Sequence, residues 1–470
     1  MAELHDLTAL EQGELLQRCE ISPGELAEHY LNRIDKLDDV GAFVTIAEER
    51  ISSCARELSI KPVGASPLWG VPTAIKDLNV TKGVRTTFGS KAFEDYMPDV
   101  SDEVTLAIEA AGMISLGKTN TPEFGSPCYT EPDVAPPAVT PWDRTRMAGG
   151  SSGGAGAAVA AGLVPLAQGS DGGGSIRIPA SCCGLVGLKP SRGRISSGPA
   201  YGDPTGLATA GPIARTVRDA AALLDVLAGH RPGDPYWAPE PVGTFLEACD
   251  RPPGRLRIAR FIEPLFVEAD VHPECRQAWE DASRLLESLG HEVVDIPRPL
   301  APELGKTFSP LWTVLTALST SRVPEERRDL LRPLTRWLGE KGERVSGVEF
   351  GLALAEARRY AADGLRTLAA YDAVLTPTLA SPPLPVGALR NDEEPWNDFH
   401  AQGEFTPWTS AWNLTGMPAI SLPLHWTPEG LPVGVMLAGR PAEEEVLLSL
   451  AAQIEEAVPW ADRKPPGWSS

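Results

Sequence analysis

Two clusters of glycine and serine lie close together in the sequence and could position a nucleophile. The first, residues 149–154, reads Gly-Gly-Ser-Ser-Gly-Gly, and the second, residues 171–177, reads Asp-Gly-Gly-Gly-Ser-Ile-Arg. Gly-rich turns expose backbone N–H groups that can point together at an anion. Three kinds of chemistry use such turns: phosphate binding, a serine nucleophile elbow, and an oxyanion hole for acyl transfer.

Phosphate binding and the nucleophile elbow both fit poorly. A phosphate loop requires a Lys directly after its glycines, and neither cluster has one. No acidic residue ends a following strand, as a dinucleotide site would require. The elbow pattern Gly-x-Ser-x-Gly is formally matched at 149–153, but an elbow follows a buried strand and needs a His base. Residues 140–146 are polar and contain Pro141, and the seven His are scattered through the chain.

An oxyanion hole fits the second cluster better. Three consecutive glycines precede Ser175, namely Gly172, Gly173 and Gly174. Their N–H groups can turn toward one point beside the serine hydroxyl, as a tetrahedral acyl-transfer intermediate requires. The candidate base is Lys76, at the end of the apolar run 70–76, because a buried Lys can lose its proton near neutral pH. The residues alone leave open the alternative that Lys76 pairs with Asp77 and the glycines only form turns.

The elements that must position these residues follow from hydrophobic periodicity and capping signals. Helices are predicted over 22–37, 102–111, 216–228, 273–289, 349–370 and 442–457. Strands are predicted over 113–116, 256–261, 292–296, 373–376, 419–422 and 432–437. Alternation along the whole length, with no linker and no repeat, predicts one large α/β domain over 1–470 with a mostly buried sheet. The segment of about 230–400 is expected to be the more variable helical and loop decoration.

Composition excludes several classes of protein. The 42 Lys and Arg against 63 Asp and Glu give a net charge of −21, which argues against a nucleic-acid or anionic-membrane binder. No apolar run is long enough to span a bilayer, and Met1–Asp6 does not resemble the start of a signal peptide, so a cytoplasmic location is expected. Seven Cys without regular spacing indicate neither disulfides nor zinc, and Cys182 and Cys183 are expected to be small core residues.

The block 149–191 resembles the signature of the amidase signature family almost from end to end. It contains both clusters, then Ile-Pro-Ala at 178–180 and Gly-Leu-Val-Gly-Leu-Lys-Pro-Ser at 184–191. Further similar stretches are 70–77, 116–124, 371–378 and 413–435. Within the family, 184–199 and 227–234 look closest to bacterial amidases of the 6-aminohexanoate cyclic-dimer hydrolase kind. The resemblance implies a mixed β-sheet core covered by helices on both faces.

The resemblance also assigns roles to residues. It implies a Ser–Ser–Lys triad in which Ser175 is the nucleophile, Ser151 the bridging serine and Lys76 the base. It implies an oxyanion hole formed by the N–H groups of residues 172–175. No metal or cofactor is expected. We expect Asp171 and Arg177 to form a partly buried pair that supports the loop shape. For Ser152, a hydrogen bond near the triad and a cap on the following helix both remain open.

The expected function is hydrolysis of a small-molecule carboxylic amide through an acyl-enzyme. Alternatives are acyl transfer or amide formation with an amine acceptor, the glutaminase subunit of a tRNA amidotransferase, or a non-catalytic binding protein. The pocket is expected near Gly125 and Ser126, whereas three tryptophans are expected more in the core than on its walls: Trp312, Trp408 and Trp412. The Pro-rich stretch 129–141 departs from the similar sequences, so their substrate preference is not transferable. A homodimer is a family-level expectation.

Overall fold

The computed structural model describes residues 3–58, 64–199 and 202–469; Met1 and Ala2 of the N-terminal stretch lie outside them. The strands are β1 (Phe43–Ile46), β2 (Pro72–Lys76), β3 (Ile114–Thr119), β4 (Leu166–Asp171), β5 (Val186–Lys189), β6 (Thr209–Ala214), β7 (Arg257–Arg260), β8 (Glu292–Asp295), β9 (Ala373–Pro377), β10 (Ala419–Trp426) and β11 (Pro432–Gly439). The helices are α1 (Ala9–Gln17), α2 (Pro23–Leu37), α3 (Glu48–Glu57), α4 (Glu103–Ala110), α5 (Gly153–Ala160), α6 (Arg177–Cys183), α7 (Val217–Leu227), α8 (Phe245–Ala248), α9 (Pro273–Ser288), α10 (Glu303–Thr320), α11 (Pro333–Glu343), α12 (Gly347–Leu368), α13 (Pro395–Phe405), α14 (Ala411–Thr415) and α15 (Glu444–Ala457).

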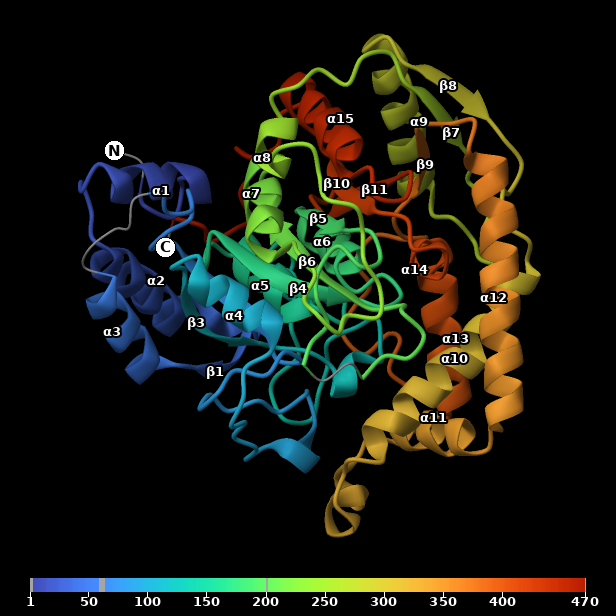
Figure 1. Ribbon diagram of the computed structural model, residues 1–470, viewed down its shortest axis with the longest axis horizontal. Helices are drawn as coiled ribbons and strands as arrows, with labels where there is room; N and C mark the ends of the chain where they lie inside the picture. The colour runs from blue at the N-terminus through green and yellow to red at the C-terminus, as the bar shows by residue number, and fades with distance from the viewer. Residues whose placement is uncertain (1–2, 59–63, 200–201, 470) are drawn as a thin grey trace.

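The strands of the described residues form two sheets. One has three strands in the order β1-β3-β2, and the other has eight in the order β4-β6-β5-β10-β11-β9-β7-β8. Both sheets are mixed, because β2 and β3 are parallel, as are β7 with β8 and β9, while the other pairs are antiparallel. The N-terminal helices α1–α3 lie at one end of the molecule and α10–α12 at the other (Figure 1).

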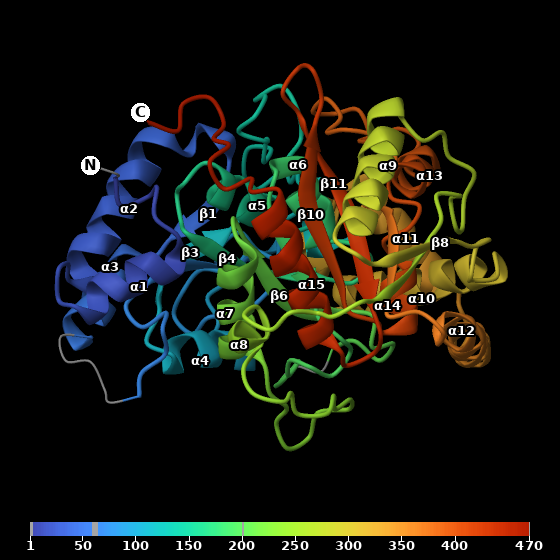
Figure 2. The ribbon, with the colours of Figure 1, turned by 90° about the horizontal axis from the view of Figure 1, so that it is seen from above.

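Helices cover both faces of the large sheet (Figure 2). Alternate side chains of a strand point to opposite faces, and here they enter two different hydrophobic cores. One core takes Ile258, Leu375 and Leu437 from β7, β9 and β11 and is closed by α9 and α15. The other takes their neighbours Ala259, Val374 and Met436 and is closed by α10, α12 and α14. The expected α/β architecture, a mixed sheet between helices, is therefore confirmed.

The two sheets meet along a seam between their edge strands β2 and β4. These strands lie side by side without a ladder of backbone hydrogen bonds between them. Side chains bridge the seam instead: the Thr73 hydroxyl donates to the Leu166 carbonyl over 3.3 Å, and Gln168 Oε1 accepts the N–H of Lys76 over 3.0 Å. The seam consequently brings the carboxyl ends of two strands, Lys76 and Asp171, to one place.

The predicted helices and strands are present, with ends displaced by a few residues. The helix predicted over 22–37, for example, is α2, and Ser22 and Glu25 form the hydrogen bonds of a capping box at its start. The strands predicted within the segment 230–400 are β7, β8 and β9, and all three belong to the large sheet. Cys182 and Cys183 are buried free thiols in the core, as expected.

Candidate active site

Strand β2 places Lys76 at the seam, with its side chain fully buried. Its Nζ donates to Ser151 Oγ over 2.7 Å, to the Ser170 carbonyl over 3.2 Å and to Ser170 Oγ over 3.1 Å. Asp77, its neighbour in sequence, pairs with Lys118 instead, at 3.6 Å. The alternative of a simple Lys76–Asp77 pair is therefore excluded, and the buried amine is held against a serine hydroxyl.

Burial lowers the pKa of Lys76 to about 7, and the negative charge of Asp171 opposes this effect. Removal from water disfavours the charged ammonium, and the carboxylate that counteracts it belongs to the residue directly after the acceptor Ser170. A lysine with a pKa near neutrality is partly uncharged at physiological pH. Lys76 can therefore accept a proton from the hydroxyl that it contacts.

Ser151 lies in the loop before α5 and follows a cis peptide bond between Gly150 and Ser151. Helix α5 can approach closely because it consists of small residues: a Cβ on Gly154 would lie 2.5 Å from the Ala42 carbonyl oxygen. The Ser152 hydroxyl donates to the Ser170 carbonyl and accepts the Ser170 N–H, both over 3.2 Å, and makes no cap bond to α5. Of the two interpretations of Ser152, the hydrogen bond near Lys76 is the one observed.

Ser175 lies between β4 and α6 and is almost buried, with 7% of its surface exposed. Its loop is held by Asp171, which accepts from Arg177 Nε over 2.9 Å and from Arg177 Nη2 over 2.8 Å, both groups being fully buried. Asn413 donates to the same carboxylate over 2.9 Å. Although burial by itself raises it, the Arg177 guanidinium holds the pKa of Asp171 well below its usual range. The expected pair is thus present, and more deeply buried than expected.

One N–H of the expected oxyanion hole has another partner. The Gly174 N–H donates to Asp171 Oδ1 over 2.8 Å, and the Ile176 N–H donates to Asp171 Oδ2 over 3.1 Å. The expectation that Gly174 contributes its N–H is therefore wrong in this conformation, because the aspartate uses that group to shape the turn. The N–H groups of Gly172, Gly173 and Ser175 remain as candidates.

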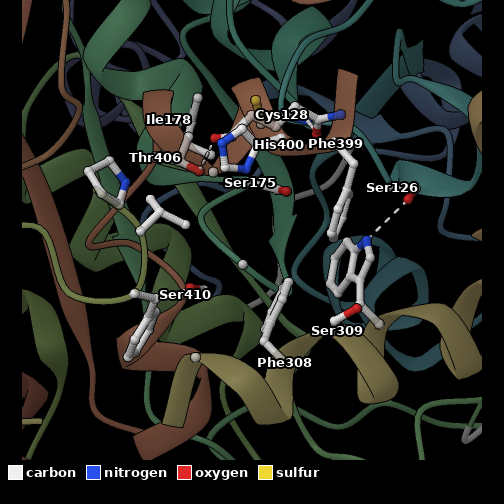
Figure 3. A pocket seen from close by; sticks show the side chains of 18 of the residues that line it. Ser126, Cys128, Ser175, Ile178, Phe308, Ser309, Phe399, His400, Thr406 and Ser410 are labelled. Carbon is white, nitrogen blue, oxygen red and sulfur yellow. Dashed lines mark hydrogen bonds between the residues drawn. The ribbon is translucent and has the colours of Figure 1, made fainter. Parts of the chain in front are cut away.

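Two cavities meet at Ser175. The larger, of about 300 Å³, has an aromatic wall that includes Phe308 and Phe399, both labelled in Figure 3, and also Trp312 and Trp396. The smaller, of about 130 Å³, has a more mixed lining of hydroxyl groups, one carboxylate, aliphatic side chains and two aromatic rings: Leu78, Phe124, Gly125, Ser126, Ser151, Ser170, Gly172, Ser175, Asp203, Leu207, Ala208, Trp312, Leu315, Thr316 and Ser319. The expected pocket residues Gly125 and Ser126 thus line a cavity that Ser175 also lines.

The three tryptophans separate into wall and core. Trp312 lines both cavities, whereas Trp408 and Trp412 are fully buried in the core that α14 helps to close. The Pro-rich stretch 129–141 supports a wall from behind: the Tyr129 hydroxyl donates to Asp398 Oδ2 over 2.6 Å, and Asp398 belongs to α13. That helix carries Trp396, Phe399 and Gln402 to the larger cavity.

Several functional residues were missed from the sequence. Ser170 and Gln168 hold Lys76, and the polar residues within the buried strand β4 were the signal that could have indicated a partner. The aromatic wall comes from α10 and α13, in the segment expected to vary, where periodicity cannot distinguish a cavity wall from core packing.

Among the described residues no helix is long and apolar enough to cross a membrane.

Comparisons with known proteins give the class to which this fold and site belong. A family model described as Amidase matches residues 25–448. The chain is 37% identical to the 6-aminohexanoate-cyclic-dimer hydrolase of Paenarthrobacter ureafaciens, over 98% of this chain and 96% of that protein. It is 35% identical to the acylamidase of Rhodococcus erythropolis, over 98% of each chain. A solved structure of 6-aminohexanoate cyclic dimer hydrolase superposes with a TM-score of 0.92 at 35% identity, covering 99% of both chains.

The chain therefore belongs to the amidase signature family and is an amidase, an enzyme that hydrolyses carboxylic amides. The finer resemblance, to hydrolases of the 6-aminohexanoate cyclic dimer, is confirmed by these relatives.

Proposed function

We propose that this amidase cleaves uncharged small-molecule amides through Ser175, Ser151 and Lys76 and an acyl-enzyme intermediate. The observation that carries the proposal is the 2.7 Å hydrogen bond from the buried Lys76 amine to Ser151, which lines the same cavity as Ser175. A base of this kind replaces the histidine of other serine hydrolases. What singles out Lys76 is its serine contact: its amine touches a hydroxyl that lines a cavity, whereas the buried Lys189 amine donates to the Pro190 carbonyl.

The proton moves in two steps. Uncharged Lys76 takes the proton of Ser151, which takes the proton of Ser175 as the Ser175 oxygen attacks the amide carbonyl carbon. The C–N bond then breaks, and Ser151 donates a proton to the departing amine while recovering one from Lys76. Water then loses a proton to the same relay and attacks the acyl carbon; the bond from this carbon to the Ser175 oxygen breaks, and the relay returns the proton to Ser175 as the carboxylic acid leaves.

The negative charge that develops on the carbonyl oxygen during the attack must be stabilised by hydrogen-bond donors. We propose the N–H groups of Gly172, Gly173 and Ser175, on the loop that the Asp171–Arg177 pair holds in shape. Because the Gly174 N–H already donates to Asp171, it supports the loop rather than the oxyanion. Each lost donor typically costs about 10²–10³ in rate.

The cavity linings favour an uncharged substrate. Neither lining contains a Lys or Arg among the described residues, and their ionisable side chains are Cys128 and His400 in the larger cavity and Asp203 in the smaller. A substrate carboxylate would therefore be buried without a cationic partner, which costs several kcal/mol or more. This disfavours glutamine, whose α-carboxylate requires such a partner, and hence the glutaminase alternative.

The test compares Ser175→Ala and Lys76→Ala with two exposed control variants, Ser288→Ala and Lys36→Ala. On a neutral anilide we expect both site variants to lose about 10³-fold or more of kcat/KM. A fluorophosphonate should label wild type at Ser175, which separates an enzyme from a binding protein of the same fold. Wild-type rates in either site variant would refute the proposal. Product analysis with added amine distinguishes water from an amine as the acceptor.

A further inference from the structure

The two cavities share a wall as well as the nucleophile. Comparing their linings shows three residues common to both: Ser126, Ser175 and Trp312. The indole of Trp312 therefore borders both cavities beside Ser175, the residue that meets the amide carbonyl in the proposed reaction. A substrate bound at Ser175 can extend past this side chain into each cavity.

Trp312 is fixed from three directions. Its Nε1 donates to Ser126 Oγ over 3.1 Å, which is the dashed bond at Ser126 in Figure 3. Its ring stacks on Phe308, with centroids 5.1 Å apart and planes 20° apart. On the nucleophile loop, a Cβ added to Gly172 would lie only 3.3 Å from the indole. The hydrogen bond to Ser126, the stacking on Phe308 and the nearby backbone of Gly172 together restrict the movement of the indole, which we call the partition.

The two sides of the partition differ in chemistry. Ser151 and Ser170 line the smaller cavity, and neither lines the larger. In the reaction proposed above, Ser151 hands a proton to the departing nitrogen, so that nitrogen must face the smaller cavity. The substituent on the other side of the carbonyl carbon then enters the larger cavity, whose wall is aromatic and aliphatic.

We propose that the larger cavity binds the acyl part of the substrate, that the smaller one binds the amine part, and that Trp312 limits the size of the amine. The assignment rests on the proposed function, because it uses the proton donor Ser151. It predicts a substrate class: amides of uncharged aryl or alkyl carboxylic acids with a smaller amine. The amine part carries no anion, because Asp203 lies on that side.

The experiment uses two series of amides with wild-type enzyme. In the first, aniline is the constant amine and the acyl group grows from acetyl to phenylpropionyl. In the second, phenylacetyl is constant and the amine grows from methylamine through aniline to naphthylamine. We expect kcat/KM to hold or rise along the acyl series and to fall by about tenfold or more at the naphthylamide, because a pocket that lacks room for added carbons discriminates to this degree.

Variants of Trp312 then test whether this side chain limits the size of the amine part. Trp312→Ala joins the two cavities and should recover about tenfold in kcat/KM for the naphthylamide relative to the methylamide. It should leave the order of the acyl series unchanged. Trp312→Phe keeps an aromatic wall without the bond to Ser126, folds with less risk, and should retain most of the discrimination. Trp237→Ala removes an exposed tryptophan that lines neither cavity, and should behave as wild type.

The outcomes separate the two proposals. Wild type that prefers large amines and small acyl groups would reverse the assignment of the cavities. If Trp312→Ala still discriminated against the large amine, or if it lost the same factor of kcat/KM in both series, the role of Trp312 as a partition would be refuted. If instead Ser175→Ala hydrolysed either series at wild-type rates, the proposed function itself would fail.

Discussion

Lys76 Nζ and Ser151 Oγ lie 2.7 Å apart, although 75 positions separate the two residues in the chain. The seam between the two sheets produces this contact. Strand β2 ends at Lys76 on one side, and β4 ends beside Ser170 on the other, so that a lysine leaves its strand directly opposite a turn rich in hydroxyl groups. No backbone ladder joins these two strands, which leaves room for an amine.

The pH dependence of the reaction should follow Lys76. Burial lowers its pKa to about 7, and Lys76 can serve as the proposed base only without its proton. We therefore expect kcat/KM on a neutral anilide to rise about tenfold per pH unit in acid and to level off above neutrality. Lys76→Arg, which stays charged, should be inactive at every pH tested. A wild-type rate that does not change between about pH 5 and 9 would contradict this assignment of the base.

Ser170→Ala should move the acidic limb of that profile. The Ser170 hydroxyl accepts a hydrogen bond from the Lys76 amine over 3.1 Å and so favours the charged form, while the Ser170 carbonyl remains as an acceptor at 3.2 Å. Its loss should lower the pKa of Lys76 and shift the limb toward lower pH, by less than about one unit.

The comparison variant for Ser170→Ala is Ser151→Ala, which removes the proton path itself. It should lose about 10²–10⁴ in kcat/KM at every pH, whereas Ser170→Ala should lose only a few-fold. A shift of the Ser170→Ala limb toward higher pH would show that this hydroxyl does not favour the charged lysine.

The sequence indicated which polar residues lie together at the candidate site better than it indicated the walls around them. The two Gly/Ser clusters and Lys76 could be recognised from the sequence alone. Glycine-rich turns and a charged residue at the end of an apolar strand are uncommon, so both patterns indicate a functional site. The helices and strands with clear periodicity were likewise predicted, including the capping box at the start of α2.

Features that depend on the packing of distant segments were not predictable. The partner of the Gly174 N–H follows from where the Asp171 carboxylate points, and Arg177 and Asn413 determine that direction from positions 6 and 242 residues away. Trp312 was placed more in the core than on a wall, because an aromatic residue on an amphipathic helix looks the same in both settings. Only the fold shows that α10 brings Trp312 to the same cavity as Gly172 and Ser175.

Gly125→Ala should impair catalysis through Ser151. Gly125 has φ +67°, and an added Cβ would lie 2.5 Å from Leu78 Cδ1 and 3.2 Å from Ser151 Oγ. The displaced serine should reduce kcat/KM by about 10²-fold, since shifts of about 1 Å have effects of that size. Gly83→Ala is the matched control, because Gly83 has φ +73° and nothing within 4 Å of the added Cβ. Both variants share the backbone strain, so equal activities would show that Ser151 tolerates the contact.

Arg177→Met should destabilise the fold in a way that depends on pH. The variant leaves the Asp171 carboxylate fully buried without its cation, and breaking a buried pair in this way costs about 3–5 kcal/mol. In wild type the depressed pKa of Asp171 gives stability that is present above the ordinary value of 3.8 and is lost as the pH falls below it.

In the variant we expect the sign to reverse, because burial, which raises the pKa of Asp171, is then opposed mainly by the weaker effects of Lys189 and Asn413. The folded variant then binds a proton more readily than the unfolded chain, so the gap in unfolding free energy between wild type and variant should shrink as the pH falls from about 7 to about 4. Urea denaturation across this range measures the gap. Arg366→Met breaks an exposed pair with Asp363 and should change stability little at any pH. A gap that stays constant with pH would mean that Asp171 finds another cation when Arg177 is removed.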